Sequence, residues 1–234
     1  MIATPHFVFV HLHKVGGQFV NRLLLAHVPG AHRIGYHLPR SETPEELRQL
    51  PVLGFIRNPW DWYVSWYAFN SITPERNPIF RIVSAHGTLG FERTIENLVR
   101  LGDSDHDAMR MVISSQLPAT RESNLGSGIT RDIMALLHEP DRGYVTWIWR
   151  YMYLLDGSFD GITTGKYESL RQDLISRLSQ LGIPVSLPMQ HAIMTTAVVN
   201  SSKHGNYKDY YSSALKQLIA RKDHEYIASC EYTF

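Results

Sequence analysis

The sequence predicts an α/β fold with a central parallel sheet flanked by helices and a helical insertion. Two short apolar runs, residues 7–12 and 51–56, suit strands that are buried on both faces, as in a parallel sheet. Each run is followed by a helical pattern, and strands that alternate with helices indicate this class. With 234 residues, 44% of them apolar, the chain suits one domain over 1–234, with the insertion at 71–150.

The first strand, loop and helix lie near the amino terminus. Residues 7–12 are apolar apart from His11 and rich in residues that favour strands. Residues 18–27 then place Phe19, Val20, Leu23 and Leu24 on one face of a helix, which we expect to stop at Pro29 and Gly30.

A second strand and helix follow at residues 51–56 and from Asn58 onward. Asn58 is the expected N-cap, with Pro59 at the first helical position and Asp61 in the first turn. Between the two strand–helix pairs, residues 43–50 predict a short helix that is capped by a threonine.

The remaining chain predicts further helices and one more strand. Residues 121–132 are expected to form a flexible loop, a candidate lid. Helical spacing is expected at 89–101, 144–157, 172–183 (closed by Gly182) and 208–228, and a strand within 161–170.

Composition limits the classes of function. Twenty-three basic and 22 acidic side chains give a net charge of +1, so there is no overall attraction to nucleic acid or to a membrane surface. No segment approaches the roughly 18 apolar residues that span a bilayer, and the first residues do not resemble a signal peptide. The single cysteine, Cys230, suits a reducing compartment. We therefore expect a soluble, cytoplasmic protein; its oligomeric state is not indicated.

The loop between the first strand and helix has the parts of an anion site. Gly16 and Gly17 let the backbone approach a ligand, the amides at the start of the helix favour an anion, and Lys14 adds a positive charge. The Ser/Thr of a Walker loop, which holds Mg²⁺, is missing after the glycines. A tight turn with an exposed lysine is the alternative.

Arg57 and Ser65 suggest a second contact to an anion. Arg57, like Lys14, follows a predicted strand, and ligands of open parallel sheets bind outside the carboxyl ends of the strands. A guanidinium and a hydroxyl suit a phosphate. The alternatives are a salt bridge for Arg57 and a hydroxyl bonded to its own helix for Ser65.

Together these segments resemble a known family. "FVHLHKVGGQFVNRLL" followed by "FIRNPWDWYVSWY" is similar to the two nucleotide-binding elements of sulfotransferases that use 3′-phosphoadenosine 5′-phosphosulfate (PAPS). "TTGKYESLRQDL" and the segment from "NYKDYY" to the end resemble later parts of its carbohydrate-type branch. The resemblance implies a P-loop-like fold and a metal-free sulfuryl transfer to a hydroxyl or amine.

The resemblance also implies roles for particular residues. Lys14 would stabilise the leaving phosphate oxygen, and Arg57 and Ser65 would bind the 3′-phosphate, as would a later basic loop with Lys203 and Gly205. The 5′-phosphosulfate would lie on the loop made of Lys14, Val15, Gly16, Gly17, Gln18 and Phe19. Gly17 and Gln18 stand where the family has Ser or Thr, and Trp62 where it often has a basic residue.

Transfer to an acceptor also needs a group that removes its proton. His37, after the first helix, is the first candidate and His13 the second. Zinc at His11, His13 and His37 is less favoured than packing, because the H-x-H pattern has no nearby cysteine. The acceptor is expected to be a carbohydrate or small molecule. A small-molecule or nucleotide kinase and a non-catalytic nucleotide-binding module remain alternatives.

Overall fold

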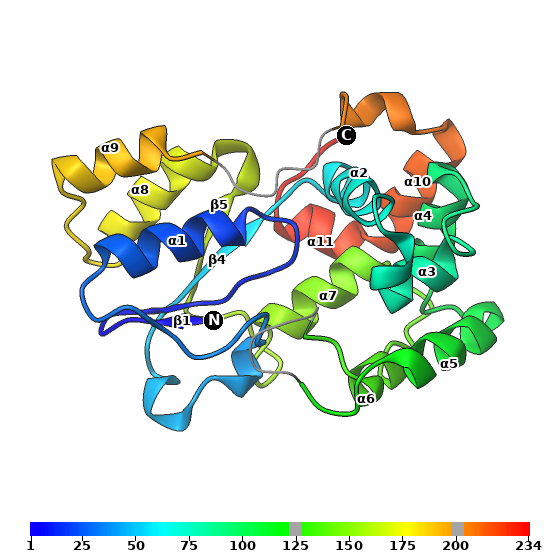
Figure 1. Cartoon of the computed structure of the whole chain (residues 1–234), viewed down its shortest axis with the longest axis horizontal. Helices are drawn as coiled ribbons and strands as arrows, with labels where there is room; N and C mark the ends of the chain where they lie inside the picture. Colours follow the sequence, from blue (N-terminus) through cyan, green and yellow to red (C-terminus); the bar gives the residue numbers. More distant parts are fainter. Residues whose placement is uncertain (122–127, 198–203) are drawn as a thin grey trace. The chain divides into compact units, whose positions relative to one another are not determined.

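The computed structural model describes residues 1–121, 128–197 and 204–234, and it contains two compact units (Figure 1). Unit 1 consists of Met1–Arg57, Ser123–Gly128 and Arg150–Ser201. Unit 2 consists of Asn58–Glu122, Ile129–Trp149 and Ser202–Phe234. Most of the predicted insertion at 71–150 belongs to unit 2, which also includes the helix after Asn58 and the carboxyl-terminal helices.

Unit 1 contains a mixed sheet with the strand order β3-β1-β2-β4-β5. Its strands are β1 (Ile2–Ala3), β2 (Val8–Phe9), β3 (His32–Arg33), β4 (Val52–Ile56) and β5 (Ile162–Lys166). The α/β class is confirmed, and β2, β4 and β5 are parallel as predicted. The prediction of a wholly parallel sheet is wrong, because β1 runs antiparallel to both β2 and β3.

A tight turn explains the antiparallel pair. The Thr4 hydroxyl accepts hydrogen bonds from the amides of His6 and Phe7 and donates one to the Phe7 carbonyl. The chain therefore reverses between β1 and β2, and strands joined by so short a connection pair antiparallel. Local side-chain bonds of this kind are typical of threonine in turns.

Strand β2 is shorter than the predicted 7–12 because a tyrosine hydroxyl enters the sheet. The Tyr153 hydroxyl accepts a hydrogen bond from the Phe55 amide and donates to the Phe55 carbonyl, both at 2.9 Å. It also lies 3.5 Å from the Val10 carbonyl. This hydroxyl occupies the backbone groups of β4 that would otherwise extend the ladder toward β2, so the chain after Val10 is free to form the loop.

The helices of unit 1 pack against this sheet and against each other. They are α1 (Gly17–His27), α8 (Leu170–Gln180) and α9 (Leu187–Thr195). Helix α1 contacts β1 and α9, and α8 contacts β5 and α9 (Figure 1). Helices α1 and α8 were predicted, whereas α9, which the Ser186 hydroxyl caps at the Met189 amide, was not.

The predicted helix at 43–50 is wrong in type and in cap. It is a single 3₁₀ turn over Glu45–Leu47, preceded by Pro44 rather than capped by Thr43. Thr43 is buried, and its hydroxyl contacts the Met1 sulfur. The threonine is therefore used in the core and cannot cap a helix.

Unit 2 is helical in the part that the structure describes. Its helices are α2 (Pro59–Asn70), α3 (Pro78–Val83), α4 (Phe91–Val99), α5 (Asp107–Gln116), α6 (Arg131–Ala135), α10 (Ser213–Lys222) and α11 (His224–Ser229). Helix α7 (Tyr144–Tyr153) begins in unit 2 and ends in unit 1. The predicted cap of α2 is confirmed, since the Asn58 side chain accepts from the amides of Trp60 and Asp61. The tryptophans that lie in α2 and α7, namely Trp60, Trp62, Trp66, Trp147 and Trp149, are all buried.

The predicted single helix at 208–228 is instead a 3₁₀ turn at Tyr207–Tyr210 followed by α10 and α11, which are divided at Asp223. The Asp223 carboxylate is fully buried and accepts hydrogen bonds from the amide and hydroxyl of Thr146 and from the hydroxyl of Tyr63. Its side chain thus points into the core of unit 2 and ties the break between α10 and α11 to α2 and α7. This long-range contact explains why α10 and α11 do not form one continuous helix.

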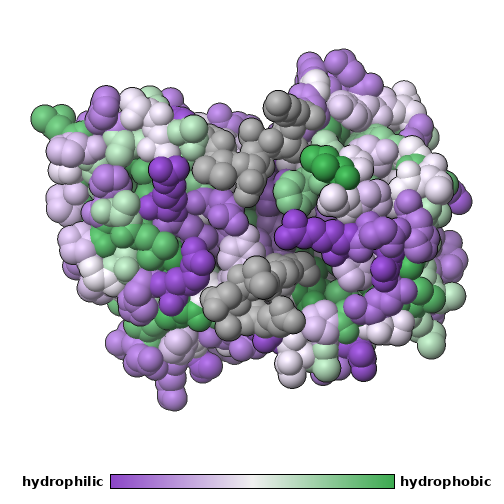
Figure 2. Space-filling view, in the orientation of Figure 1, coloured by the Kyte–Doolittle hydropathy of each residue, from purple (hydrophilic) through white to green (hydrophobic). Residues whose placement is uncertain are grey.

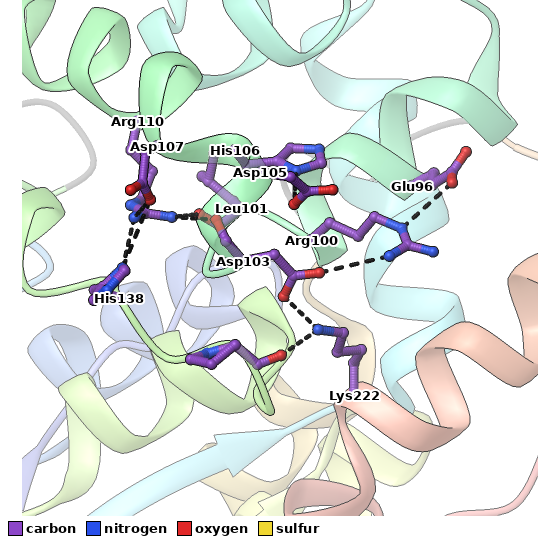
Figure 3. A network of polar contacts seen from close by, with 11 residues as sticks. Glu96, Arg100, Leu101, Asp103, Asp105, His106, Asp107, Arg110, His138 and Lys222 are labelled. Atoms are coloured by element: carbon purple, nitrogen blue, oxygen red, sulfur yellow. Dashed lines mark hydrogen bonds and ion pairs between the residues drawn. The ribbon is translucent and has the colours of Figure 1, made fainter.

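A network of paired charges joins α4, α5 and α10 within unit 2 (Figure 3). Lys222 contacts the Asp103 carboxylate and the Pro140 carbonyl. Arg100 lies 3.5 Å from Asp103 and 3.4 Å from Glu96. Each basic group in this network therefore has an acidic or carbonyl partner.

No helix in the described ranges has both the length and the apolar character needed to cross a membrane.

Candidate functional site

The loop after β2 turns sharply before it enters α1. Lys14 has φ of 62° and Gly16 has φ of 78°, both in the left-handed region. Gly16 is the N-cap of α1, and its carbonyl accepts from the amides of Phe19 and Val20. The predicted anion contact from the Phe19 amide thus competes with a bond inside the loop. The Gly17 and Gln18 amides precede these first helical bonds and are better placed for a ligand.

Both glycines of the loop are required by close packing. A Cβ on Gly17 would lie 1.8 Å from the His11 ring, and one on Gly16 would lie 2.7 Å from Leu170. Gly16 also has a positive φ, which glycine adopts at least cost. The Ser or Thr that the resembled family has at position 17 therefore cannot be placed here, because His11 lies beneath the loop.

The structure brings Lys14 and Arg57 together at the carboxyl ends of β2 and β4. The Arg57 Nη1 donates a hydrogen bond of 3.0 Å to the Lys14 carbonyl. Its guanidinium carbon lies 4.0 Å from the centre of the Tyr167 ring, a cation–π contact. Burial and the neighbouring Arg57 charge lower the pKa of Lys14 to about 8. Two like charges in a partly desolvated place favour an anion between or beside them.

Three histidines stack next to this pair. The rings of His37 and His13 lie 3.9 Å apart and nearly parallel, and those of His37 and His11 lie 4.2 Å apart. The His37 Nδ1 donates to the His11 carbonyl at 2.8 Å, which leaves Nε2 as its basic nitrogen. Burial and the neighbouring histidines hold the pKa of His37 and of His11 well below the usual range, so both are neutral at pH 7.

The rings of the three histidines pack against one another. Among residues 1–121, 128–197 and 204–234, no group of three or more His, Cys, Asp or Glu side chains could hold a metal ion. The rings of His13 and His37 are nearly parallel, so the lone pairs of their nitrogens lie in separate parallel planes and do not converge on one centre. The histidines are packed against each other, as the sequence favoured.

Sequence reasoning missed Tyr167, Tyr36 and Asn21 as parts of this site. Tyr167 supports Arg57, and the Tyr36 hydroxyl accepts a 2.6 Å hydrogen bond from the Gln18 side chain. Asn21 lies 3.3 Å from His11 through its Nδ2 and the ring Nδ1. Tyr167 comes directly after β5, so the rule that placed Lys14 and Arg57 at strand ends would also have found Tyr167.

The other predicted ligands belong to unit 2 or are not described. Ser65 is buried within α2, and Trp62 is buried against Trp66 and Tyr63. Gly205 is exposed, and nothing lies within 4 Å of a Cβ placed on it, so packing does not require a glycine there. Lys203 and residues 122–127 of the candidate lid lie outside the described residues.

One described residue of the predicted lid does touch the site. Gly128, within the predicted lid at 121–132, lies against His37, since a Cβ on Gly128 would be 2.4 Å from the His37 carbonyl. The Gly128 carbonyl accepts a 3.3 Å hydrogen bond from the Tyr151 hydroxyl.

The arrangement can hold an anion against two cations and the first amides of a helix, and the neutral His11 and His37 belong to the same unit. No protein-family model matches the chain, and a search of curated proteins found no similar sequence.

Proposed function

We propose that this chain is a PAPS-dependent sulfotransferase with the P-loop-like architecture of that family. It would move a sulfuryl group from PAPS to a hydroxyl or amine of an acceptor, a carbohydrate or small molecule. The observation that carries the proposal is the meeting of Lys14 and Arg57 at the ends of adjacent parallel strands. A nucleotide with phosphates at both its 3′ and 5′ positions offers a separate anionic group to each of these two cations.

Lys14 and the loop would act on the breaking bond. In the transfer, the sulfur–oxygen bond to the 5′-phosphate breaks while a bond forms from the acceptor oxygen to sulfur. Negative charge then develops on the phosphate oxygen. With a pKa of about 8, Lys14 is mostly protonated at pH 7 and can stabilise that charge, together with the Gly17 and Gln18 amides.

The acceptor proton would go to a histidine of the stack. His37 has its Nδ1 hydrogen held by the His11 carbonyl, and it is neutral at pH 7, so Nε2 can accept a proton. His13 stacks directly on it and stays the second candidate. A lowered pKa makes His37 a weak base, but a base that is neutral at the working pH is fully available.

The 3′-phosphate would be bound through Arg57, which Tyr167 and the Lys14 carbonyl hold in place. A guanidinium fixed on two sides loses little freedom when it binds a phosphate. The contributions of Ser65, Lys203 and Gly205 remain predictions of the sequence.

Calorimetric titration with adenosine 3′,5′-bisphosphate and with Mg-ATP tests the proposal. We expect selective binding of the bisphosphate, and replacing Arg57 by Met should weaken it about 10- to 100-fold, as expected for loss of charge-assisted bonds. The Lys14→Met variant should lose most sulfuryl transfer from PAPS.

Arg177→Met, which removes a positive charge elsewhere in unit 1, is the matched control and should bind normally. Preference for Mg-ATP would favour the kinase alternative. Bisphosphate binding without transfer to any hydroxyl or amine acceptor would favour the non-catalytic module. An unchanged affinity of Arg57→Met for adenosine 3′,5′-bisphosphate would contradict the proposed role of Arg57 in binding the 3′-phosphate.

A further inference from the structure

Helix α5 of unit 2 has uncharged side chains on the face that points away from the core. Four exposed residues share the spacing i, i+3, i+4 and i+7 of one helical face, namely Ala108, Met111, Val112 and Ser115. We call this surface the α5 face. Met111 is 73% exposed and Val112 is 44% exposed, whereas Ile113 on the opposite side of the helix is fully buried. Surface helices usually present charged or polar groups to water, so an exposed apolar face indicates contact with another molecule.

Helix α6 and the residues after it widen this apolar surface. The Ser114 hydroxyl donates to the Arg131 carbonyl at 3.1 Å. Nearer the start of α5, the Arg110 Nη2 donates to the His138 Nδ1 at 2.7 Å. This segment therefore runs antiparallel to α5 along one side, and its Leu136 is 73% exposed. Helices α5 and α6 lie side by side in Figure 1, and in the same region of Figure 2, at the lower right, hydrophobic residues lie among hydrophilic ones.

The α5 face has an acidic group near one end and a basic group near the other. Asp107 lies in the first turn of α5, where it contacts Arg110, and 53% of its side chain is still exposed. The exposed Arg131 lies beside Ser114, in the last turn of the helix. Asp107 is also 3.7 Å from the His138 Nδ1, on the side of α5 that contacts α6. Asp107 and Arg131 therefore lie on the same side of α5, at opposite ends.

We propose that the α5 face joins two copies of this chain in a two-fold symmetric dimer with antiparallel α5 helices. The two-fold axis would lie in the plane of contact and perpendicular to α5. It reverses the direction of the helix but keeps the α6 side of one copy next to the α6 side of the other. Asp107 of each copy then faces Arg131 of the other, and the apolar residues meet at the centre.

The two charges favour a second copy as the occupant of the α5 face. A partner of uniform charge would be repelled at one end of this face, whereas an antiparallel copy matches the charge at both ends. The antiparallel order also brings the opposite ends of the two helix dipoles together. The proposal is independent of the nucleotide site, because it uses residues of unit 2 alone.

Sedimentation velocity of the full chain tests the association. Helix α5 has 10 residues and is about 15 Å long, so the contact is small and we expect a reversible dimer with a dissociation constant of about 1–100 µM. Runs at about 1 to 300 µM protein should therefore show the sedimentation coefficient rise from that of a monomer to that of a dimer. A monomer throughout this range overturns the proposal.

Met111→Glu tests the location of the interface. A carboxylate at the centre of the contact would be buried in the dimer, so we expect the dissociation constant to rise at least about tenfold. Met111 is exposed in the free chain, so the variant should fold normally, which thermal unfolding checks. Leu187→Glu, at an 81% exposed leucine of α9 in unit 1, is the matched control and should dimerise like the parent. A dimer that persists in Met111→Glu, or that is lost equally in Leu187→Glu, places the contact elsewhere and overturns the proposal.

Charge reversal tests the antiparallel order. Arg131→Glu should weaken the dimer about three- to tenfold, because each Asp107 then faces a like charge, and Asp107→Lys should act in the same way from the other end. In an equimolar mixture of these two variants, the heterodimer has one original and one reversed pair, so association should return to within about threefold of the parent. A mixture that dimerises no better than either variant contradicts this arrangement. The results for Met111→Glu and Arg131→Glu decide the proposal even if Asp107→Lys, which also loses a contact with Arg110, does not fold.

Discussion

Two lysines, Lys222 in unit 2 and Lys14 in unit 1, have charged neighbours of different sign. In unit 2, Lys222 contacts the Asp103 carboxylate, and Arg100 lies between two acidic residues (Figure 3). In unit 1, burial and then the neighbouring charge of Arg57 lower the pKa of Lys14. Opposite charges in contact stabilise the fold, whereas like charges brought together cost free energy. An anion bound near Lys14 and Arg57 would offset the repulsion between their charges. Ionisable groups with shifted pKa values are frequent at functional sites.

Local packing shows the same difference. The loop of unit 1 approaches His11 so closely that position 17 must be glycine, while the loop around Gly205 in unit 2 has open space at the corresponding Cβ position. Tight backbone packing at Gly17 leaves the amides at the start of α1 at a defined place. We conclude that Gly16 and Gly17 serve a fixed geometry, a requirement that packing does not impose at Gly205.

The largest expected effect is that of Gly17→Ala. A methyl group 1.8 Å from the His11 ring cannot be accommodated without moving the loop or the ring. We expect the free energy of unfolding to fall by about 3 kcal/mol or more, together with loss of bisphosphate binding. Urea unfolding measures the first effect. Gly205→Ala is the control, with a change below about 0.5 kcal/mol; similar losses in both variants would remove the contrast between the two loops.

The next effect concerns the buried carboxylate of unit 2. Burial raises the pKa of Asp223 from 3.8 to about 6, although it accepts three hydrogen bonds. The folded state therefore binds a proton more readily than the unfolded state. The stability contributed by this proton is complete below about pH 4 and is lost as pH rises through about 6, a change of up to about 3 kcal/mol.

Asp223→Asn should abolish this part of the pH dependence, because the amide does not titrate. Urea unfolding of the parent and the variant at several pH values between 4 and 7 measures the difference directly. Asp209→Asn, at an exposed carboxylate, provides the control for a changed net charge. If the parent and Asp223→Asn show the same dependence on pH, the carboxylate does not titrate in this range.

The smallest effect compares two lysines with the same substitution. Lys222→Met should lower the free energy of unfolding by about 1 kcal/mol, because it removes a partly buried ion pair. Lys14→Met should raise it by a similar amount, because it relieves a charge that burial and Arg57 disfavour. Urea unfolding at pH 7 gives both signs. Destabilisation by both variants would show that the Lys14 charge is stabilised in the fold and would weaken the case for an anion site.

Much of the local structure could be predicted from the sequence. The helix after Asn58 begins where its cap and Pro59 indicate, because capping depends on residues three positions apart. Helices α1 and α8 begin within two residues of the predicted starts, since hydrophobic spacing on a helix is also a local property. The strand-end rule placed Lys14 and Arg57 at one edge for a related reason, because Arg57 directly follows β4 and Lys14 lies in the loop between β2 and α1.

The sequence by itself determined the strand–loop–helix segments, the caps and the chemical character of the loop, because each depends on residues a few positions apart. Only the tertiary structure decided where β2 stops, where the carboxyl-terminal helix breaks and how the histidines stack. Tyr153, Asp223 and His37 reach partners 98, 77 and 26 positions away in the chain. Such contacts form only when the chain is folded, and they override the local preference of the segments that they join.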